Sequence, residues 1–378
     1  MMQDDFIPVS APSLLGNEKV YVNECLETTW ISSIGRFIGE LERGFAEYCG
    51  VEHAVSCFNG TVALHLALLG IGVGPGDEVL VPSLTYVASA NAVRYCGAEP
   101  VFVDSDRRTW NLDPEDLRRK ITPRTRAVMA VHLYGKPAPM GEIREIAAAA
   151  GLQVVEDAAE AIGASWGGRP VGGLSEVAAF SFFGNKVITC GEGGMVLTGD
   201  GDLARKIRQL KGQGQDFDRR YWFPVVGYNY RMTNVQAALG LAQLEKVGDY
   251  LSARDEIAAW YRQELEGHPD LVLPARDPQE RSVCWLFSAV LPRHAGEARD
   301  EVMARMRQAG VDSRPFFYPC HVLPPYQGGR PADCPHAEWL GARGLSLPTW
   351  VGMTREHVRR VASALAAALE AVGVGVGS

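Results

Sequence analysis

Short apolar runs alternate with helical stretches through the first two thirds of the chain. Of all the features of the sequence, this alternation limits the possible folds most strongly. It is typical of parallel strands joined by right-handed crossovers that contain helices. We therefore predict an α/β fold with a parallel or mostly parallel sheet. The predicted strands are 54–57, 78–81, 100–103, 127–133, 153–156, 178–182 and 194–198, and helices are predicted over 61–69, 86–95 and 140–150.

The glycine-rich run Gly-Ile-Gly-Val-Gly-Pro-Gly at 70–76 has the appearance of a dinucleotide-binding loop. Such a loop follows a strand and opens a helix. Here the run closes a predicted helix and precedes the strand EVLV, so we interpret it as a helix stop followed by a turn.

The pattern changes in the last third, where a long apolar-periodic stretch covers residues 235–265. It is too long and regular for another crossover, and we expect it to bridge two domains. A predicted strand at 284–291 and predicted helices at 300–309 and 357–371 indicate a small α+β domain. The expected division is a large domain with the N-terminal segment, 1–249, and a small C-terminal domain, 250–378.

Composition argues against several classes of protein. The 378 residues are 47% hydrophobic and 22% charged, as in soluble globular proteins, and no run reaches the roughly 20 apolar residues of a membrane helix. The formal net charge is −8, so we expect no nucleic-acid partner. The beginning of the chain, MMQDDFIPVS, lacks the basic-then-apolar pattern of a secretion signal, and we expect a cytoplasmic protein without membrane association.

The eight cysteines are scattered without a C-x-x-C pair, which favours reduced thiols over a disulfide framework. A zinc site could be sought at Cys320, His321, Cys334 and His336. Their spacing matches no standard zinc site, and the Pro-Pro and Gly-Gly between them favour a substrate loop. We therefore expect no metal.

The strongest candidate constellation is Asp157, at the end of the strand QVVED, together with Lys186, just past the strand AAFSFF. Ligands of open α/β sheets lie at the carboxyl ends of strands. Pyridoxal 5'-phosphate (PLP) chemistry needs a lysine that forms a Schiff base with the cofactor and later moves a proton. It also needs a carboxylate that keeps the pyridine nitrogen protonated. Taken alone, Asp157 would suit a helix N-cap and Lys186 a surface position.

A bound phosphate needs backbone amides at a helix N-terminus, supplemented by hydroxyl groups. Asn59-Gly60-Thr61, between a predicted strand and a predicted helix, offers this arrangement, and Ser181 could add a hydroxyl. Thr61 could instead be a plain N-cap. Tyr86, after the strand EVLVP, is placed to stack on a pyridine ring, although it could also pack in the core.

These motifs resemble those of the DegT/DnrJ/EryC1/StrS sugar aminotransferases, which belong to fold type I of the PLP enzymes. The resemblance covers essentially the whole chain and is carried by segments such as NGTVALHLAL, VVEDAAEAIGA, SFFGNKVITCGEGGMVLT and GYNYRMTNVQAALGLAQLE. It implies an aspartate aminotransferase-like fold, with a mostly parallel seven-stranded sheet in the large domain and a smaller α+β C-terminal domain. It also implies transamination in two half-reactions, through pyridoxamine 5'-phosphate.

The resemblance also implies a role for each matching residue. Lys186 and Asp157 are the catalytic residues, and Glu160 lies near the 3-hydroxyl of the cofactor. Asn229 reaches the phosphate from the neighbouring subunit, which makes a homodimer with a shared active site the expected unit. Arg231 holds a carboxylate of the amino donor, usually L-glutamate. The implied cofactor-binding set is Gly60, Thr61, Tyr86, Asp157, Glu160, Ser181, Lys186 and Asn229.

Within the family, SFFGNKVITCGEGG, LKGQGQDFDRRYWFPVVGYNYRMTN and RPFFYPCHVLPPY are most similar to the branch that aminates C4 of GDP-4-keto-6-deoxymannose to GDP-perosamine. Two cysteines, Cys190 and Cys320, depart from that branch, where Thr and Met or Leu are expected. The residues implied to line the sugar-nucleotide site are Arg314, Tyr318 and His321, with Tyr221 and Trp222 as further candidates.

Three alternatives remain open. The substrate could be a TDP- or UDP-linked 4-keto sugar, or a 3-keto sugar. A dehydratase of the same family is disfavoured, because such relatives carry His in place of Lys186. The chain could also be a PLP-binding regulatory protein without turnover, although the intact pair of Asp157 and Lys186 argues against this.

Overall fold

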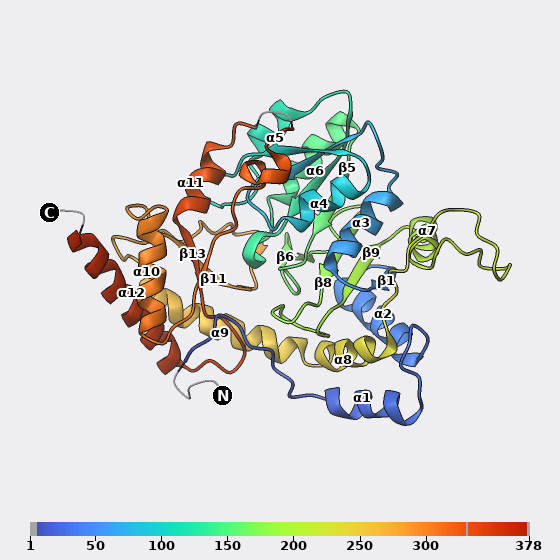
Figure 1. The fold of residues 1–378 in the computed structure, drawn as a ribbon, viewed down its shortest axis with the longest axis horizontal. Helices are drawn as coiled ribbons and strands as arrows, with labels where there is room; N and C mark the ends of the chain where they lie inside the picture. Colours follow the sequence, from blue (N-terminus) through green and yellow to red (C-terminus); the bar gives the residue numbers. More distant parts are fainter. Residues whose placement is uncertain (1–5, 330–331, 376–378) are drawn as a thin grey trace.

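The computed structural model describes residues 6–329 and 332–375. Within them, a seven-stranded sheet has the order β1-β9-β8-β5-β4-β2-β3 (Figure 1). Only β9 runs antiparallel to its neighbours in this sheet, so the sheet is mostly parallel, as predicted. All seven predicted strands are present: β1 (His53–Cys57), β2 (Glu78–Pro82), β3 (Glu99–Val103), β4 (Thr125–Val131), β5 (Gln153–Asp157), β8 (Val177–Ser181) and β9 (Gly194–Thr198).

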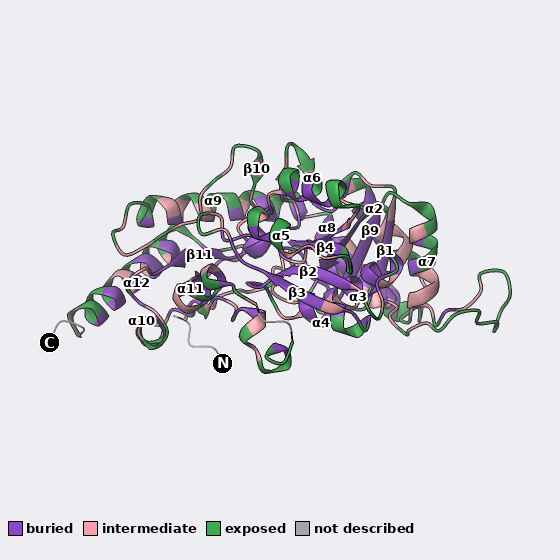
Figure 2. Ribbon diagram, turned by 90° about the horizontal axis from the view of Figure 1, so that it is seen from above, coloured by how far each residue is buried: buried purple, intermediate pink, exposed green. Residues whose placement is uncertain are grey.

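Helices cover both faces of the sheet, because alternate strand residues point to opposite sides. In β4, Ala127 and Met129 join one buried cluster, and Val128 and Ala130 join another. The first cluster includes α3 (Gly60–Gly70), α4 (Ala88–Tyr95) and α7 (Gly201–Lys211). The second includes α2 (Arg36–Cys49), α6 (Met140–Ala150) and α8 (Asn234–Leu244). The buried strands between these layers are seen in Figure 2.

The predicted stretch 235–265 forms two helices, α8 and α9 (Val247–Leu265), which break at residues 245–246. They run along one side of the molecule, from α1 (Glu18–Glu27) and α2 toward the C-terminal elements (Figure 1). These include a small antiparallel sheet of β11 (Phe287–Val290), β13 (Gly344–Leu347) and β12 (Arg314–Pro315), with α10 (Glu297–Gln308) and α12 (Arg355–Gly375). The predicted α+β layout is therefore present, whereas the division at residue 249 stays a prediction.

The remaining elements are short and lie around these two sheets. They are α5 (Pro114–Lys120), α11 (Pro335–Arg343), β6 (Ser165–Trp166), β7 (Arg169–Pro170), β10 (Glu280–Arg281) and the 3-10 turns Leu133–Gly135, Cys320–Val322 and Pro324–Tyr326. No helix in the described ranges is both long and apolar enough to span a membrane. All eight cysteines lie in these ranges, and all are free thiols.

Three local predictions can be compared with the structure. Residues 70–76 do end α3 and turn into β2, with Gly72 and Gly76 at φ of 84° and 93°. The helix predicted from Tyr86 begins only at Ala88, because residues 83–87 form bends and a turn after β2. The strand predicted from Cys284 begins at residue 287, because Cys284 has a φ of 46°, which no strand residue adopts.

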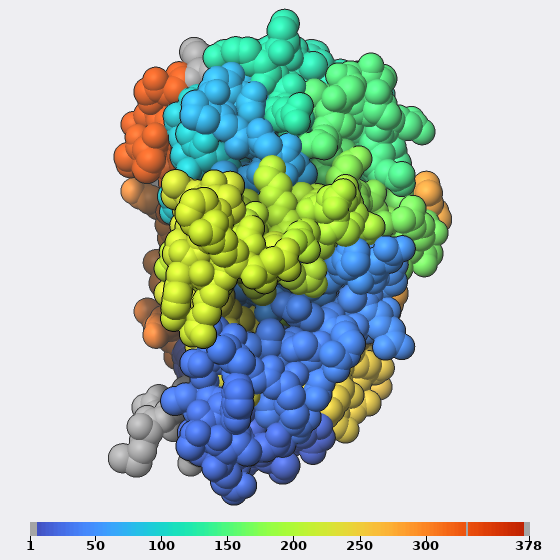
Figure 3. Space-filling model, turned by 90° about the vertical axis from the view of Figure 1, so that its right-hand side faces the viewer, coloured from blue at the N-terminus to red at the C-terminus, as the bar shows by residue number. Residues whose placement is uncertain are grey.

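A long loop leaves the body of the protein after α7 and returns before α8. We call residues 213–227 the projecting loop (Figures 1 and 2). Several of its large apolar side chains are exposed, among them Tyr221, Trp222, Phe223 and Val226. In Figure 3 the loop and the N-terminal segment lie together on one face of the molecule.

Candidate active site

The carboxyl ends of β1, β5 and β8 lie at the same edge of the sheet, because these three strands run in one direction. Asp157 ends β5, Ser181 ends β8, and Asn59 and Gly60 follow β1. Lys186 follows Ser181 in the loop between β8 and β9. The topology therefore brings the main predicted residues to one edge.

Gly60 and Ser181 are packed so closely that a side chain at position 60 does not fit. A Cβ on Gly60 would lie 2.7 Å from Cβ and 3.0 Å from Oγ of Ser181. The N-cap of α3 is Asn59, whose side chain accepts a hydrogen bond from the amide of Val62 at 3.0 Å. Thr61 is therefore not the cap, and its hydroxyl lies in the first turn. The helix start and the Ser181 hydroxyl form the kind of cradle that accepts a phosphate.

Asp157 is buried and held in one orientation by two hydrogen bonds. Ser89, in the first turn of α4, donates its hydroxyl to Oδ2 at 2.7 Å, and the amide of Ala159 donates to Oδ1 at 3.2 Å. Burial raises the pKa of Asp157, while the Ser89 hydrogen bond acts in the opposite direction. A cation facing this carboxylate would stabilise its ionised form.

Lys186 is partly buried, with its ammonium group over an aromatic ring. Its Nζ lies 4.0 Å from the ring centroid of Trp285. Burial lowers the pKa of Lys186, and the charges of Glu160 and Asp157 partly oppose this effect. The amine is thus closer to its unprotonated, nucleophilic state than a surface lysine would be.

Glu160 lies close enough to Lys186 and Asp157 for their charges to affect its ionisation. It is buried, and its Oε2 accepts a hydrogen bond from the amide of Tyr134 at 2.7 Å. Burial raises the pKa of Glu160 to about 7, with a further contribution from Asp157 and an opposing one from Lys186. Near neutral pH this carboxyl group can therefore either donate or accept a proton.

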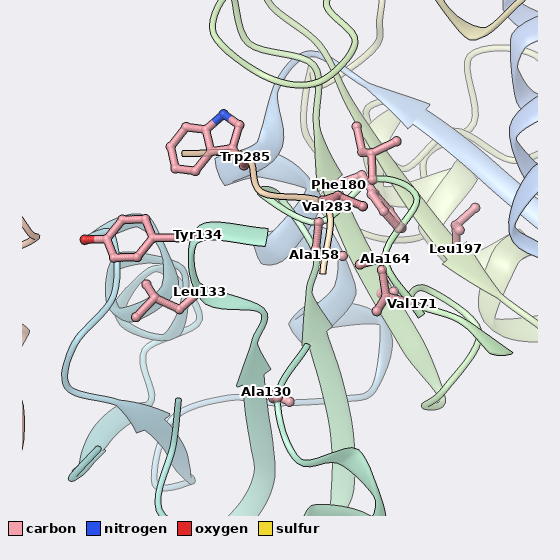
Figure 4. Close-up of a cluster of buried hydrophobic side chains, with 14 of the residues drawn as sticks. Ala130, Leu133, Tyr134, Ala158, Ala164, Val171, Phe180, Leu197, Val283 and Trp285 are labelled. Carbon is pink, nitrogen blue, oxygen red and sulfur yellow. The ribbon is translucent and has the colours of Figure 1, made fainter. Parts of the chain in front are cut away.

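The sequence reasoning did not identify Trp285 and Tyr134. The Trp285 indole donates to the backbone oxygen of Asn185 at 2.7 Å, which fixes the ring beside Lys186. The rings of Tyr134 and Trp285 are stacked, with centroids 6.4 Å apart, although they come from distant segments (Figure 4). Tyr134 follows the carboxyl end of β4, which is a signal that could have been used, whereas Trp285 follows no strand of the large sheet.

A second group of predicted residues gathers beside these rings. Tyr86 is exposed rather than in the core, and its ring lies 5.6 Å from that of Phe317. The amide of Phe317 in turn donates to the hydroxyl of Tyr134 at 3.1 Å. Tyr318 is exposed on the same segment, and Nδ1 of His321 lies 2.6 Å from the Ser83 hydroxyl. The loop after β2 and residues 316–321 thus form one wall of the site.

Other predicted residues are not brought to this centre within the single chain. Arg314 pairs with Asp312 at 3.2 Å, and Nε of Arg231 donates to the Ser33 hydroxyl at 3.2 Å. The remaining three are exposed and lie on or just beyond the projecting loop, namely Tyr221, Trp222 and Asn229.

The cysteines that depart from the family pattern are both buried. Burial raises the pKa of Cys320 to about 12 and raises that of Cys190 as well, so neither thiol is reactive.

His321 is hydrogen-bonded to Ser83 and lies 3.1 Å from Glu338. Among the described residues, no three His, Cys, Asp or Glu side chains are grouped as metal ligands.

Comparison with known proteins gives matches over nearly the whole chain. GDP-perosamine synthase of Caulobacter vibrioides is 54% identical over 360 residues, which cover 95% of this chain and 97% of that protein. GDP-perosamine synthase of Escherichia coli O157:H7 is 47% identical over 353 residues, covering 93% and 96%. The crystal structure of S. venezuelae DesV in complex with a ketimine intermediate is similar with a TM-score of 0.87 and 39% identity, covering 92% and 93%. Because the sequence model of the DegT/DnrJ/EryC1/StrS aminotransferase family also matches residues 12–366, the chain belongs to this family.

Proposed function

We propose that the protein is a PLP-dependent aminotransferase that transfers an amino group from L-glutamate to C4 of GDP-4-keto-6-deoxy-D-mannose, giving GDP-perosamine. The observation that carries the proposal is the buried group of Lys186, Asp157 and Glu160 at the strand ends. The choice of sugar is supported by the 54% identity with the Caulobacter vibrioides enzyme. The proposed location is the cytoplasm.

The described residues fit PLP at each of its polar groups. The start of α3 and the Ser181 hydroxyl, which lies close to Gly60, would hold the phosphate. Asp157 would pair with the ring nitrogen, and Glu160 would serve the 3-hydroxyl. When bound, the cofactor supplies an electron sink that stabilises the carbanion formed when the amino donor loses its α-proton.

The protein residues orient the reacting groups and move the proton. Nζ of Lys186, whose pKa is lowered by burial, takes the α-proton from the amino donor and returns a proton to the sugar carbon. Asp157, held by Ser89, would keep the ring nitrogen protonated, and the cation there would favour the ionised carboxylate. The ring of Trp285 covers Nζ and excludes water from one side of the amine.

We propose that the active unit is a homodimer with a shared site. Asn229 is exposed next to the projecting loop and would reach the cofactor phosphate of the neighbouring subunit, and Arg231 would bind a carboxylate of glutamate. The exposed apolar side chains of the projecting loop and of the N-terminal segment, including Leu15, Trp30 and Ile34, support an interface on the face shown in Figure 3.

Sugar recognition is assigned to the wall formed by residues 316–321. Tyr318 is exposed on this wall, and the pairing of His321 with Ser83 fixes the imidazole. Arg314 would need to leave Asp312 to reach a nucleotide phosphate.

The test is to incubate the PLP-loaded protein and L-glutamate separately with GDP- and TDP-4-keto-6-deoxy sugars and to identify the products by mass spectrometry. We expect amination of the GDP-linked sugar, and loss of turnover in Lys186→Ala. Lys246→Ala is the matched control, because Lys246 is an exposed lysine paired with Asp249. Product from the TDP sugar alone would refute the GDP assignment, and turnover by Lys186→Ala would refute the role of Lys186.

A further inference from the structure

A second cavity lies beside the candidate active site and has a volume of about 790 Å³. Its walls are formed by α9, the turns at 109–110 and 133–136, and the segment 273–288. Lys186, Asp157 and Glu160 do not line it. This volume lies within the roughly 300–1,000 Å³ of small-molecule sites.

Two hydrogen-bond donors on the cavity wall are buried without an acceptor. Nε1 of Trp110 and Nε of Arg262 are both among the buried side-chain atoms of the described chain that have no hydrogen-bond partner. Trp110 is only 4% exposed. Buried donors are nearly always satisfied, so two orphaned donors on residues of one wall mark this wall as unusual, although both atoms lie beneath its surface.

The charges on the wall favour an anionic ligand. On this wall Lys136 forms an ion pair with Glu280, and Arg281 forms one with Asp255. The charged wall residues outside these two pairs are Arg262, Arg276 and Asp277. No described carboxylate forms an ion pair with either of these two arginines, and Asp277 Oδ1 accepts the amide of Gln279 at 2.8 Å.

The two free guanidinium groups lie close enough to repel each other. Burial lowers the pKa of Arg262, and the charge of Arg276 lowers it further, while Glu266 and Glu280 oppose this only in part. An oxyanion between the two arginines would relieve the repulsion and accept charge-assisted hydrogen bonds from both.

The backbone of the same wall is strained. Six non-glycine residues in the described ranges have a positive φ, and three of them line this cavity: Trp110 (69°), Tyr134 (53°) and Cys284 (46°). Such conformations cost free energy and gather at ligand sites. The strain is therefore a separate indication that this wall is shaped for binding rather than for stability alone.

We propose that this cavity binds a small organic dianion, with its phosphate or dicarboxylate oxygens between Arg262 and Arg276. Apolar side chains such as Leu273 and Phe287 contact its body. The site adjoins the proposed PLP site and shares Tyr134 with it. Its residues Cys284 and Leu286 also flank Trp285, the residue that covers Lys186.

The test is calorimetric titration of the PLP-loaded protein, in a buffer without phosphate or sulfate, with phenyl phosphate, phthalate and the neutral phenol. We expect one or both anions to bind and phenol not to bind. Arg262→Met and Arg276→Met should each weaken binding about ten- to a hundred-fold, the usual worth of a charged hydrogen bond. Arg305→Met is the matched control, because Arg305 is exposed on α10 and pairs with Glu301.

Binding of phenyl phosphate alone would identify the ligand as a phosphate monoester, and binding of phthalate alone would identify a dicarboxylate. Failure of both anions to bind, or equal affinity in Arg276→Met and the unaltered protein, would overturn the proposal. Arg276 is exposed, so its replacement does not endanger folding. Arg262→Met should also leave the Tm unchanged or higher without any ligand, because it removes an unpaired charge; a lower Tm would show that Arg262 serves the fold instead.

Discussion

Replacing Glu160 by Gln should make the cofactor-free protein more stable at neutral and alkaline pH. Burial raises the pKa of Glu160 from 4.5 to about 7, so the folded state favours the protonated form. The stability that this preference contributes is complete below pH 4.5 and is lost as the pH rises through 7. At about 1.36 kcal/mol per pKa unit, the loss amounts to about 3 kcal/mol. Gln keeps the acceptor for the amide of Tyr134 and has no proton to lose.

The assay is urea unfolding between pH 5 and pH 8 at one fixed protein concentration. The free energy of unfolding of Glu160→Gln, minus that of the unaltered chain, should increase with pH by up to about 3 kcal/mol. The control is Glu145→Gln, on the exposed surface of α6, for which the difference should stay constant. A difference for Glu160→Gln that does not change with pH would refute the raised pKa and the burial argument behind it.

Two further predictions concern the same site, and a third concerns the cysteines. Ser89→Ala should move the acid limb of the pH–activity profile to higher pH, because Asp157 loses the hydrogen bond that lowers its pKa; an unchanged profile would contradict this. Gly60→Ala should weaken PLP binding at least about ten-fold, because the new Cβ would meet Ser181. The measurement is the visible absorbance that the protein retains after dialysis. The control is Gly248→Ala, on α9 with open space around it, which should retain PLP. Thiol titration at pH 8 should be slow until denaturant is added, because burial raises cysteine pKa values, that of Cys57 to about 12; rapid reaction of several thiols in the native protein would show that they are accessible.

The central sheet could be predicted from the sequence because its strands are buried on both faces. Such strands appear as continuous apolar runs, and each of the seven was placed within one or two residues of its observed ends. The errors lie where tertiary contacts decide the backbone. Cys284 takes a positive φ and shortens its strand, and α8 and α9 separate at residues 245–246, although the apolar periodicity continues through both places.

The site could be predicted only as far as residues that follow strands. Asp157 and Ser181 end strands, and Lys186 lies in the next loop, so the rule for open α/β sheets located them. Ser89 also comes soon after a strand, and a polar residue in the first turn of α4 is a signal that could have been used. Trp285 could not be found in this way, because it lies 100 residues from Asn185, its hydrogen-bond partner.

The position of β9 has a consequence for the order in which the protein can become functional during synthesis. β9 separates β1 from β8, and Gly194 at its start packs against the backbone of Asn59 so closely that a side chain would not fit. The helix start after β1 and the hydroxyl of Ser181 therefore reach their final spacing only after β9 has been inserted. A nascent chain that has not yet emerged from the ribosome as far as Thr198 has Lys186 but no completed cradle, so a phosphate could be held there only after nearly 200 residues have emerged.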